Sequence, residues 1–563
     1  MFKTIKKNLK LDKDLFYLFF YVHAFPLFFI IFNNYIKNNI SPFEDLQKTF
    51  IAIFNFFIAF LILYLLFKII FKTKYKVILN TLLIIVLFLN AIDIFLYSNF
   101  SMQLTPELLN IFFETNQNEA KEFLIAFFNP KLILPVGYIV LGFLWIKSFS
   151  KFKFLKLSLL IIIFSIFSIK FLDISGNERI RKKHIVKNIY FSFSRYFKEA
   201  KDLQLFLNNF ENNTKNITVE SLDGNDATYI LIIGESFTKY HSSLYGYPRN
   251  TNPYMKSLAD KQELYTFTDI VSPHHFTRET LKKLVTTYSH NSEVPFEKSM
   301  NIIDIMKKAG FKTYWISNQE DFAYRGAGLS AIAHRADSTK YTENNFSEDK
   351  NVKIYDEYVL PLLDEAINDK STNKKFIVIH LFGSHAVYKS RYPKEFITFD
   401  IDSTADFFNQ KQLENKEIVN HYDNSLIYND FIIKSIIENS KLHDKNSFIL
   451  YLSDHGQAVY EDINESTSPI PTKTLRSVEI PLIFWSSNLY RKNHPEIFKN
   501  LKNSLNRPYG SEDIIYTLID LCNLNYSQHK PERSVINPQF KPKQRMISSE
   551  GHIYEEIKMK KNN

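Results

Sequence analysis

The sequence predicts two parts of different class: an α-helical membrane domain with five transmembrane helices, and an α/β domain with a mainly parallel sheet. Long apolar stretches recur through the first third of the 563-residue chain, which also holds a disproportionate share of its 54 Phe. From Ala227 onward the pattern changes to short apolar runs that are bounded by polar turns and alternate with helix-like stretches. The runs lie at 229–233, 312–316, 376–380, 448–452 and 480–485, and helix-like stretches lie at 300–308 and 424–440. The contrast between these patterns indicates a membrane domain joined to a globular one.

The membrane prediction depends on the length of the apolar stretches, because a helix needs about 20 residues to cross a bilayer. Five stretches are long enough or nearly so: Leu15–Phe32, Phe50–Phe71, Val77–Tyr97, Leu132–Phe149 and Phe154–Leu172. Lysines gather at the N-terminus, between the second and third stretches, and between the fourth and fifth. These positions all lie on one side of the membrane, which the positive-inside rule makes the cytoplasm.

An odd number of spans places everything after residue 172 in the periplasm of a bacterial inner membrane. We therefore expect a membrane domain over residues 1–172, a connector over 173–226 and a periplasmic catalytic domain over 227–563. The connector begins basic and continues with aromatic residues, which suits helices lying on lipid headgroups. A linker helix packed on the globular domain is the equal alternative.

The charge and the cysteine content of the chain limit the kinds of partner and of covalent cross-link that it can have. The chain has 69 Lys and Arg against 59 Asp and Glu, a formal net charge of +10. The sequence contains no pattern of basic residues interleaved with aromatic residues that would indicate a nucleic-acid site. Much of the excess positive charge lies beside the apolar stretches, which favours a membrane surface as its partner. Cys522 is the single cysteine, so no intramolecular disulfide can form. Its apolar neighbours predict a core residue.

In the second part, acid and imidazole groups follow three of the predicted strands. Glu235 follows the run at 229–233, His380 and His385 come at and after the run at 376–380, and Asp454 and His455 follow the run at 448–452. The carboxyl ends of parallel strands meet at one edge of a sheet, where ligands bind. Carboxylate and imidazole together suit Zn²⁺. The sequence therefore predicts a metal site at this edge.

These residues lie in segments that resemble the phosphoethanolamine transferases, which modify lipid A and lipooligosaccharide and belong to the alkaline phosphatase/sulfatase superfamily. The matching segments are Phe113–Leu124, Ile230–Pro253, Ser272–Thr287, Trp315–Gln319, His380–Pro393 and Ser453–Gln457. They follow the family's order and cover nearly the whole chain, and five spans before the catalytic domain match as well. The resemblance implies an alkaline phosphatase/sulfatase-like fold for the periplasmic domain.

The resemblance also implies roles for single residues. Glu235, Asp454 and His455 are expected to bind zinc, and Thr277 aligns with the nucleophile, whose oxygen also touches the metal. Thr280, three residues further on, is the alternative nucleophile if the alignment with the family is shifted.

Substrate contacts are expected in two further segments. His385 matches a histidine that contacts the phosphoryl group, and we expect His380 to bind substrate as well. Glu114 and Asn116 lie where the family's membrane domain approaches its lipid substrate.

The implied reaction takes phosphoethanolamine from phosphatidylethanolamine through a covalent phosphothreonine and passes it to lipid A or the lipooligosaccharide core. Zn²⁺ would activate the threonine hydroxyl, which is a poor nucleophile on its own. A phosphoglycerol transferase of the same superfamily and a non-catalytic membrane scaffold are the alternatives.

One departure from the family concerns a histidine that usually follows the Asp-His-Gly motif a short way on. The segment 457–481 contains none. Five residues are candidates to replace it: Glu461, Glu465, His274, His275 and His334.

Overall fold

The computed structural model describes residues 75–100, 128–148, 185–223, 226–319, 328–342, 355–439, 445–461, 474–548 and 551–562, with scattered positions between 18 and 71 and between 120 and 125. The chain divides into two compact units, Met1–Phe197 and Lys198–Asn563. Each unit is described by itself.

The first unit contains the helices α4 (Tyr75–Phe100) and α7 (Ile133–Ser148), which contact one another. Asn90 of α4 donates from Nδ2 to the carbonyl oxygen of Val22 at 2.6 Å. The two helices coincide with the third and fourth predicted spans, while the other three predicted spans fall mostly outside the described residues. Among the residues that are described, no helix is both long and apolar enough to cross a membrane. The five-span arrangement therefore stays a prediction.

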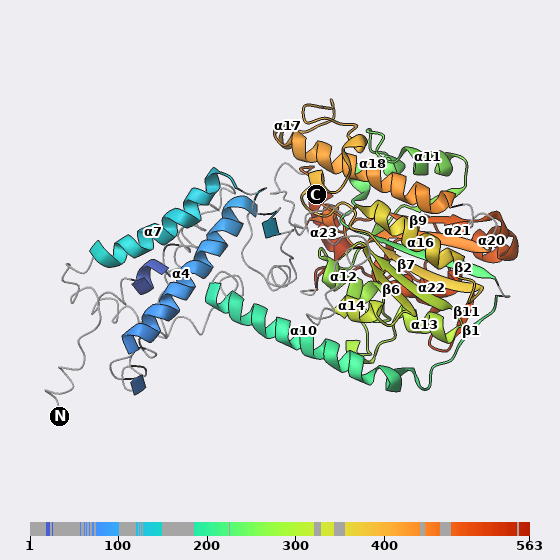
Figure 1. Ribbon diagram of the computed structural model, residues 1–563, viewed down its shortest axis with the longest axis horizontal. Coiled ribbons are helices and arrows are strands. Elements are labelled where there is room, and N and C mark those ends of the chain that lie inside the picture. The colour runs from blue at the N-terminus through green and yellow to red at the C-terminus, as the bar shows by residue number, and fades with distance from the viewer. Residues whose placement is uncertain are drawn as a thin grey trace. The chain divides into compact units, whose positions relative to one another are not determined.

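The second unit is built on a sheet that has seven strands in the described part of the chain, in the order β3-β9-β8-β2-β7-β5-β6 (Figure 1). The strands are β2 (Ala227–Gly234), β3 (Leu264–Phe267), β5 (Lys312–Ser317), β6 (Ser338–Tyr341), β7 (Lys374–His380), β8 (Ser447–Ser453) and β9 (Leu482–Ser486). Strands β8, β2, β7, β5 and β6 run parallel, and β9 is antiparallel to β8 and β3. The predicted mainly parallel sheet is confirmed.

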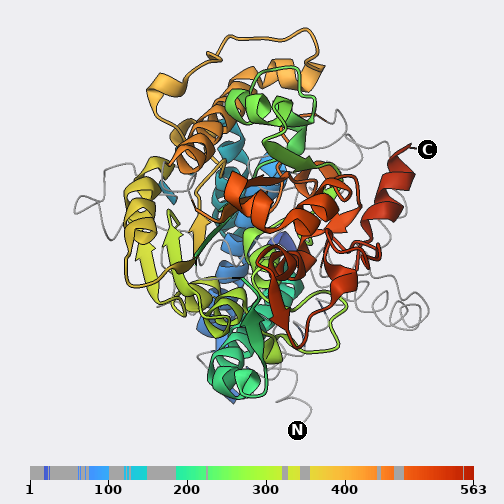
Figure 2. The same cartoon turned by 90° about the vertical axis from the view of Figure 1, so that its right-hand side faces the viewer.

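Helices cover both faces of this sheet (Figures 1 and 2). The helices of the second unit, with α10 crossing the boundary between units, are α10 (Ile185–Thr214), α11 (Pro253–Asp260), α12 (Thr277–Leu284), α13 (Ile302–Lys308), α14 (Gly328–Ala333), α16 (Val359–Asn368), α17 (Gln410–Glu414), α18 (Lys416–Glu438), α20 (Asn488–Asn493), α21 (Pro495–Lys502), α22 (Ile514–Leu521) and α23 (Tyr554–Asn562). Two short sheets pair β1 (Val219–Ser221) with β11 (Leu524–Tyr526) and β4 (Ile270–Val271) with β10 (Tyr509–Gly510).

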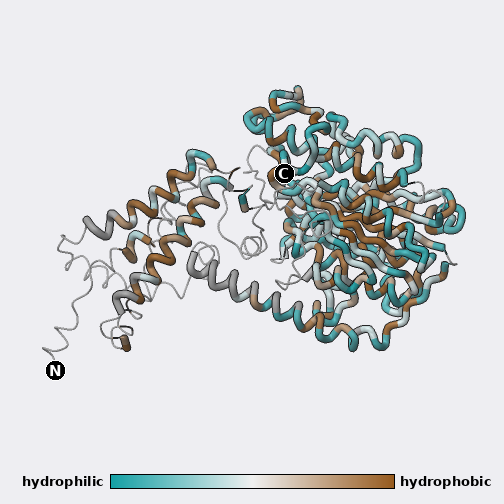
Figure 3. The backbone as a smooth tube through the Cα atoms, viewed as in Figure 1, coloured by the Kyte–Doolittle hydropathy of each residue, from teal (hydrophilic) through white to brown (hydrophobic). Residues whose placement is uncertain are grey.

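Alternate residues of the central strand β2 serve opposite faces of the sheet, as the two-residue period of a strand requires. Leu231 and Ile233 pack with residues of α12, α13 and α22, and Ile230 and Ile232 pack with residues of α11, α16 and α18. Every residue of β2 is buried, which gives the continuous apolar run typical of a strand covered on both faces. Figure 3 shows this hydrophobic interior between more polar outer segments.

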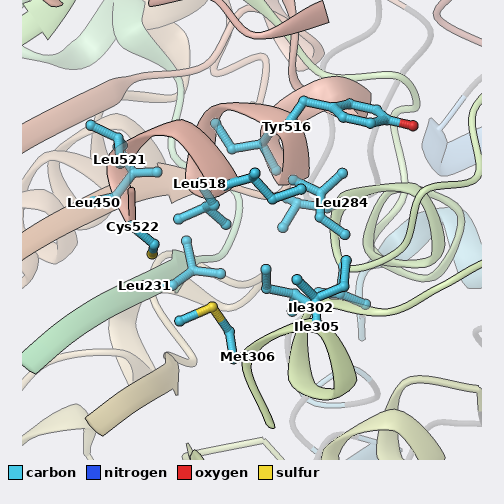
Figure 4. Packing of buried hydrophobic residues seen from close by; sticks show 14 of the residues in the cluster. Leu231, Leu284, Ile302, Ile305, Met306, Leu450, Tyr516, Leu518, Leu521 and Cys522 are labelled. Carbon is cyan, nitrogen blue, oxygen red and sulfur yellow. The ribbon is translucent and has the colours of Figure 1, made fainter. Parts of the chain in front are cut away.

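The core against α12 fixes the helix that carries the candidate nucleophile. Leu284 of α12 packs with Leu231 of β2, Ile302 of α13 and Leu518 of α22 (Figure 4). Cys522 belongs to the same cluster, as its apolar sequence context predicted.

The second half of α10 also belongs to this unit. Phe206 and Phe210 are buried in its core, whereas Phe197, Leu205 and Leu207 of the same helix are exposed. The packed face matches the linker-helix alternative for this part of the connector.

Candidate metal centre and active site

The candidate residues lie where three neighbouring parallel strands end. Strand β2 lies between β8 and β7, with Ile233 beside His380 and Gly234 beside Ser453. The residues that follow, Glu235 on β2 and Asp454 on β8, therefore leave the sheet at the same edge. This is the convergence that the sequence predicted from the strand ends.

Glu235, Asp454 and His455 form a buried group whose ligand atoms all lie within 4.8 Å of one another. His455 Nε2 lies 3.3 Å from Glu235 Oε1 and 3.5 Å from Asp454 Oδ2. Two carboxylates and an imidazole at this spacing match a first shell for Zn²⁺, which takes oxygen and nitrogen ligands.

Thr277 adds a hydroxyl to this group. It is the first residue of α12, and its Oγ1 donates to Glu235 Oε2 at 3.0 Å and lies 3.3 Å from His455 Nε2. Thr280 is fully buried, and its Oγ1 instead donates to the carbonyl oxygen of His274 at 3.3 Å and lies 3.2 Å from Ser272 Oγ. Thr277 therefore contacts the acidic group, whereas the hydrogen bonds of the Thr280 hydroxyl within the described residues go to His274 and Ser272.

The three buried groups change one another's pKa values. Burial opposes ionisation of Glu235, but the hydrogen bond and charge of His455 hold its pKa below the usual range. Burial and the charge of Glu235 raise the pKa of Asp454 to about 8. Burial lowers the pKa of His455, yet Asp454 and Glu235 raise it to about 9 overall. The group therefore holds protons at neutral pH that a divalent cation can replace.

One oxygen of the group lacks a hydrogen-bond donor within the described residues, although it lies 3.5 Å from His455 Nε2. Asp454 Oδ2 is buried and accepts no hydrogen bond from the described residues. A buried carboxylate oxygen without a donor is costly unless a cation binds it. The two carboxylates and the imidazole therefore form a donor set that could hold a divalent cation, and Zn²⁺ is one metal that accepts such ligands.

Residues beside the ligands fix their orientation. Ser236 has a left-handed backbone with φ of 58°, its N–H donates to Asp454 Oδ1 at 3.1 Å, and its hydroxyl donates to Glu235 Oε1 at 2.7 Å. His455 Nδ1 lies 2.8 Å from the carbonyl oxygen of Gly456, a contact that leaves Nε2 to face the acidic group. Sequence reasoning missed Ser236, although its place directly after Glu235 was a signal.

The segment after β7 supplies the two predicted histidines. His380 is buried, and burial lowers its pKa to about 4, so its ring is neutral at pH 7. His385 is half-buried, and its Nδ1 has no hydrogen-bond partner in the described part of the chain. Between them, Gly383 has φ of +52° and lies directly on the backbone of Glu235, and Ser384 N donates to the Glu235 carbonyl oxygen at 3.0 Å.

Several predicted residues lie elsewhere or are not described. Glu114, Asn116 and Glu465 lie outside the described residues. Glu461 is turned toward a buried histidine, with Oε1 3.4 Å from His241 Nε2 and Oε2 accepting from Val459 N at 2.5 Å.

The three remaining candidates contact residues outside the acidic group. His275 Nδ1 lies 2.7 Å from Ser477 Oγ, the ring of His274 contacts the rings of His275 and Phe276, and the His334 ring contacts Tyr341.

Comparison with known proteins places this geometry in a family. Residues 227–524 match the Sulfatase family model. The chain is 31% identical over 482 residues to the phosphoethanolamine transferase EptC of Escherichia coli strain K12, covering 80% of this chain and 81% of that protein. The chain belongs to the phosphoethanolamine transferase family of the alkaline phosphatase/sulfatase superfamily. The family suggested by the sequence segments is thus confirmed.

Other relatives agree with this placement. The phosphoethanolamine transferase CptA of Salmonella typhimurium is 29% identical over 479 residues, covering 80% of this chain and 81% of that protein. The C-terminal periplasmic domain of Escherichia coli EptC, solved in complex with Zn, has a TM-score of 0.55 at 31% identity and covers 60% of this chain and 96% of that one.

A full-length structure resembles the whole chain. The integral membrane protein lipooligosaccharide phosphoethanolamine transferase A of Neisseria meningitidis has a TM-score of 0.69 and covers 94% of this chain and 99% of that one. At 19% identity this likeness bears on the fold alone.

Proposed function

We propose that this family member transfers phosphoethanolamine from phosphatidylethanolamine to lipid A or the lipooligosaccharide core through a covalent intermediate on Thr277. The observation that carries the proposal is the contact of the Thr277 hydroxyl with Glu235 and His455 in a buried acidic group. The names of the relatives, which are phosphoethanolamine transferases, support the group that is transferred.

The reaction has two displacements at phosphorus. In the first, the Thr277 hydroxyl loses its proton, its oxygen bonds to phosphorus, and the bond to the diacylglycerol oxygen breaks as that oxygen takes up a proton. In the second, an acceptor hydroxyl or phosphate oxygen attacks the same phosphorus and releases Thr277, which regains a proton. Both steps build charge on the phosphoryl oxygens, which positioned donors can stabilise.

Glu235, Asp454, His455 and Thr277 would hold the zinc ion. When bound, Zn²⁺ supplies Lewis-acid chemistry that favours the alkoxide of a coordinated hydroxyl and offsets phosphoryl charge.

The position of Thr277 and the nearby histidines suit the same steps. The first backbone N–H groups of α12 are available at Thr277, because Phe276 at the N-cap makes no side-chain cap, and helix N-termini favour anions. His385 is the candidate donor to the phosphoryl or leaving oxygen, and the neutral His380 lines the substrate side.

The placement in the cell follows from the same proposal. The catalytic domain is periplasmic and the N-terminus cytoplasmic, with five spans over residues 1–172 in the inner membrane and a connector over 173–226 before the catalytic domain. Glu114 and Asn116 approach the lipid donor. The periplasmic domain of Escherichia coli EptC, to which the chain is 31% identical, supports the periplasmic placement of the catalytic domain.

The test is intact-mass analysis of the full chain in nanodiscs with Zn²⁺ and phosphatidylethanolamine. Wild type and Thr280→Ala should gain a phosphoethanolamine adduct that peptide mapping assigns to Thr277, while Thr277→Ala should gain none. Thr280→Ala is the matched control because it deletes a nearby threonine hydroxyl that contacts Ser272 and not Glu235.

Two other outcomes would contradict the proposal. An adduct formed only from phosphatidylglycerol would indicate a phosphoglycerol transferase. No adduct from either lipid in the zinc-loaded chain would favour the scaffold alternative.

A further inference from the structure

The segment that carries His385 is held by an unusually complete set of backbone hydrogen bonds. Leu381 N donates to the carbonyl oxygen of Ile233 at 2.9 Å, and Ser384 N donates to that of Glu235 at 3.0 Å. The two N–H groups between them, those of Phe382 and Gly383, donate to a single side chain.

That side chain is Asp356, at the start of a short 3-10 helix that spans Asp356–Tyr358. Its Oδ1 accepts from Phe382 N at 2.8 Å and its Oδ2 accepts from Gly383 N at 2.9 Å. Asp356 is 3% exposed and lies between the strands β6 and β7 in the sequence, so it belongs to none of the strands that carry the acidic group. A carboxylate that accepts two neighbouring backbone N–H groups fixes the direction of that backbone.

Further contacts hold Asp356 itself in place. Asn318, directly after β5, donates from Nδ2 to Asp356 Oδ1 at 2.8 Å, and Thr342 donates to Asn318 Oδ1 at 2.5 Å. Asn318 N also donates to the carbonyl oxygen of His380 at 2.9 Å, and Gln319 Nε2 donates to that of Leu381 at 3.2 Å. Asn318 and Gln319, the two residues after β5, therefore hold the beginning of the segment.

Two further residues, Arg391 and Ser425, also contact the segment. The guanidinium of Arg391 lies 4.3 Å from the centre of the Phe382 ring, and its Nε donates to the carbonyl oxygen of Ala386 at 3.3 Å. Ser425 of α18 donates to Ser384 Oγ at 2.9 Å. With Asp356 in place, the backbone from Leu381 to Ala386 has little freedom, and His385 lies within it.

We infer that Asp356 is a positioning residue for the transfer reaction, because it fixes the 381–386 backbone so that His385 faces the phosphoryl group on Thr277. The inference rests on the proposed function and deepens it. Within the described residues, the hydrogen bonds of the Asp356 side chain go to Phe382, Gly383 and Asn318 and not to the side chains of the candidate metal ligands, so its effect is expected on turnover through His385. Loss of a buried residue that orients an active-site group typically lowers activity about 10–100-fold.

The experiment is a double-mutant cycle in the zinc-saturated full chain in nanodiscs, with release of a labelled phosphatidylethanolamine headgroup as the assay. In Asp356→Asn, the side-chain NH₂ faces backbone N–H donors, so at least one of them loses its acceptor. We expect kcat to fall about 10–100-fold with KM changed less than about threefold. In the His385→Ala background, the same change should lower kcat less than about threefold.

The matched control is Asp430→Asn. Asp430 is also a buried carboxylate that accepts two backbone N–H groups, those of Tyr254 at 2.8 Å and Met255 at 3.0 Å, but its partners lie on α11. Its effect should be small and equal in both backgrounds. If Asp356→Asn and His385→Ala instead multiply, Asp356 does not act through His385 and the inference is overturned.

Two further measurements keep the test decisive. If Asp356→Asn does not fold, Asn318→Ala removes the third donor of Asp356 together with the acceptor of Thr342, and its smaller loss of kcat must also vanish in the His385→Ala background. If wild type does not turn over phosphatidylethanolamine, the proposed function fails. The positioning role of Asp356 is then tested separately, by the imidazole NMR signals of His385 in the zinc-loaded chain. A shift in Asp356→Asn but not in Asp430→Asn supports the positioning role, and unchanged signals overturn it.

Discussion

The substitution Gly383→Ala tests how closely the backbone of residues 381–386 packs against Glu235 of the candidate metal centre. A Cβ at Gly383 would lie 2.9 Å from both the backbone N and O of Glu235, whereas ordinary contact begins at 3.4 Å. The backbone of Glu235 must therefore retreat by roughly 3.4 − 2.9 = 0.5 Å, which is the tolerance to which a functional constellation must be held. We expect zinc affinity to fall about 10–100-fold.

The same substitution lowers stability for two reasons that can be separated. Placing a side chain at a φ of +52° costs about 1–2 kcal/mol, and forcing atoms into a packed site costs about 1–3 kcal/mol more. Gly310→Ala is the matched control, since Gly310 has φ of +84° and nothing within 4 Å of its added Cβ. Only the first cost applies there, so Gly383→Ala should be about 1–3 kcal/mol less stable than Gly310→Ala.

The assay combines zinc competition against a chromophoric chelator with thermal melting of the full chain in detergent. At about 2 °C per kcal/mol for a domain of this size, the two variants should differ in Tm by about 2–6 °C, with the control retaining wild-type zinc affinity. Equal Tm values together with wild-type zinc affinity in Gly383→Ala would refute the close packing of this segment on Glu235.

Three further predictions concern the described residues of the catalytic unit. Burial lowers the pKa of His241, but Asp423 raises it to about 9 overall. The protonated His241 paired with Asp423 therefore stabilises the folded state fully below about pH 6.5, and this contribution is lost as the pH rises through about 9. It amounts to at most about 3 kcal/mol, and His241→Gln should flatten the fall in Tm between pH 6.5 and 9.5. The thiol of Cys522 is fully buried and burial raises its pKa, so maleimide labelling should follow global unfolding; labelling of the folded protein would contradict this. Gly456→Ala would place a Cβ 2.4 Å from the carbonyl oxygen of Arg476, so we expect loss of bound zinc by metal analysis, and retention would contradict it.

The core strands could be predicted from the sequence because their apolar runs are short, continuous and bounded by turns. Predicted runs at 229–233, 312–316, 376–380, 448–452 and 480–485 correspond to β2, β5, β7, β8 and β9 within one or two residues. The antiparallel direction of β9 could not be read, since an apolar run does not encode its direction. The edge strands β3 and β6 were missed because they are four residues long, and β6 is only partly buried.

Helix α18 shows a different limit of sequence reasoning. The sequence predicted a helix over 424–440, but α18 begins at Lys416. The missed N-terminal part, residues 416–423, carries buried polar side chains such as Tyr422 and Asp423, which break the apolar periodicity. These side chains contact the segment after β2: Tyr422 donates to the carbonyl oxygen of Ser236 at 2.7 Å, and Asp423 lies 2.6 Å from His241 Nδ1. Their pattern is explained by tertiary contacts and not by the period of the helix.

The same distinction separates the candidate ligands from the residue that positions His385. Glu235, Asp454 and His455 could be predicted because they come within two residues of the ends of β2 and β8, and the topology of a parallel sheet then brings these ends to one edge. Asp356 follows no strand, and its role depends on two N–H groups that lie 26 and 27 residues further along the chain. Only Asn318, directly after β5, gave a local sign that this loop region is held by side chains. The sequence therefore predicts those residues of the site that the sheet topology places at the strand ends. A residue whose side chain fixes the backbone of a distant segment can be found only in the structure.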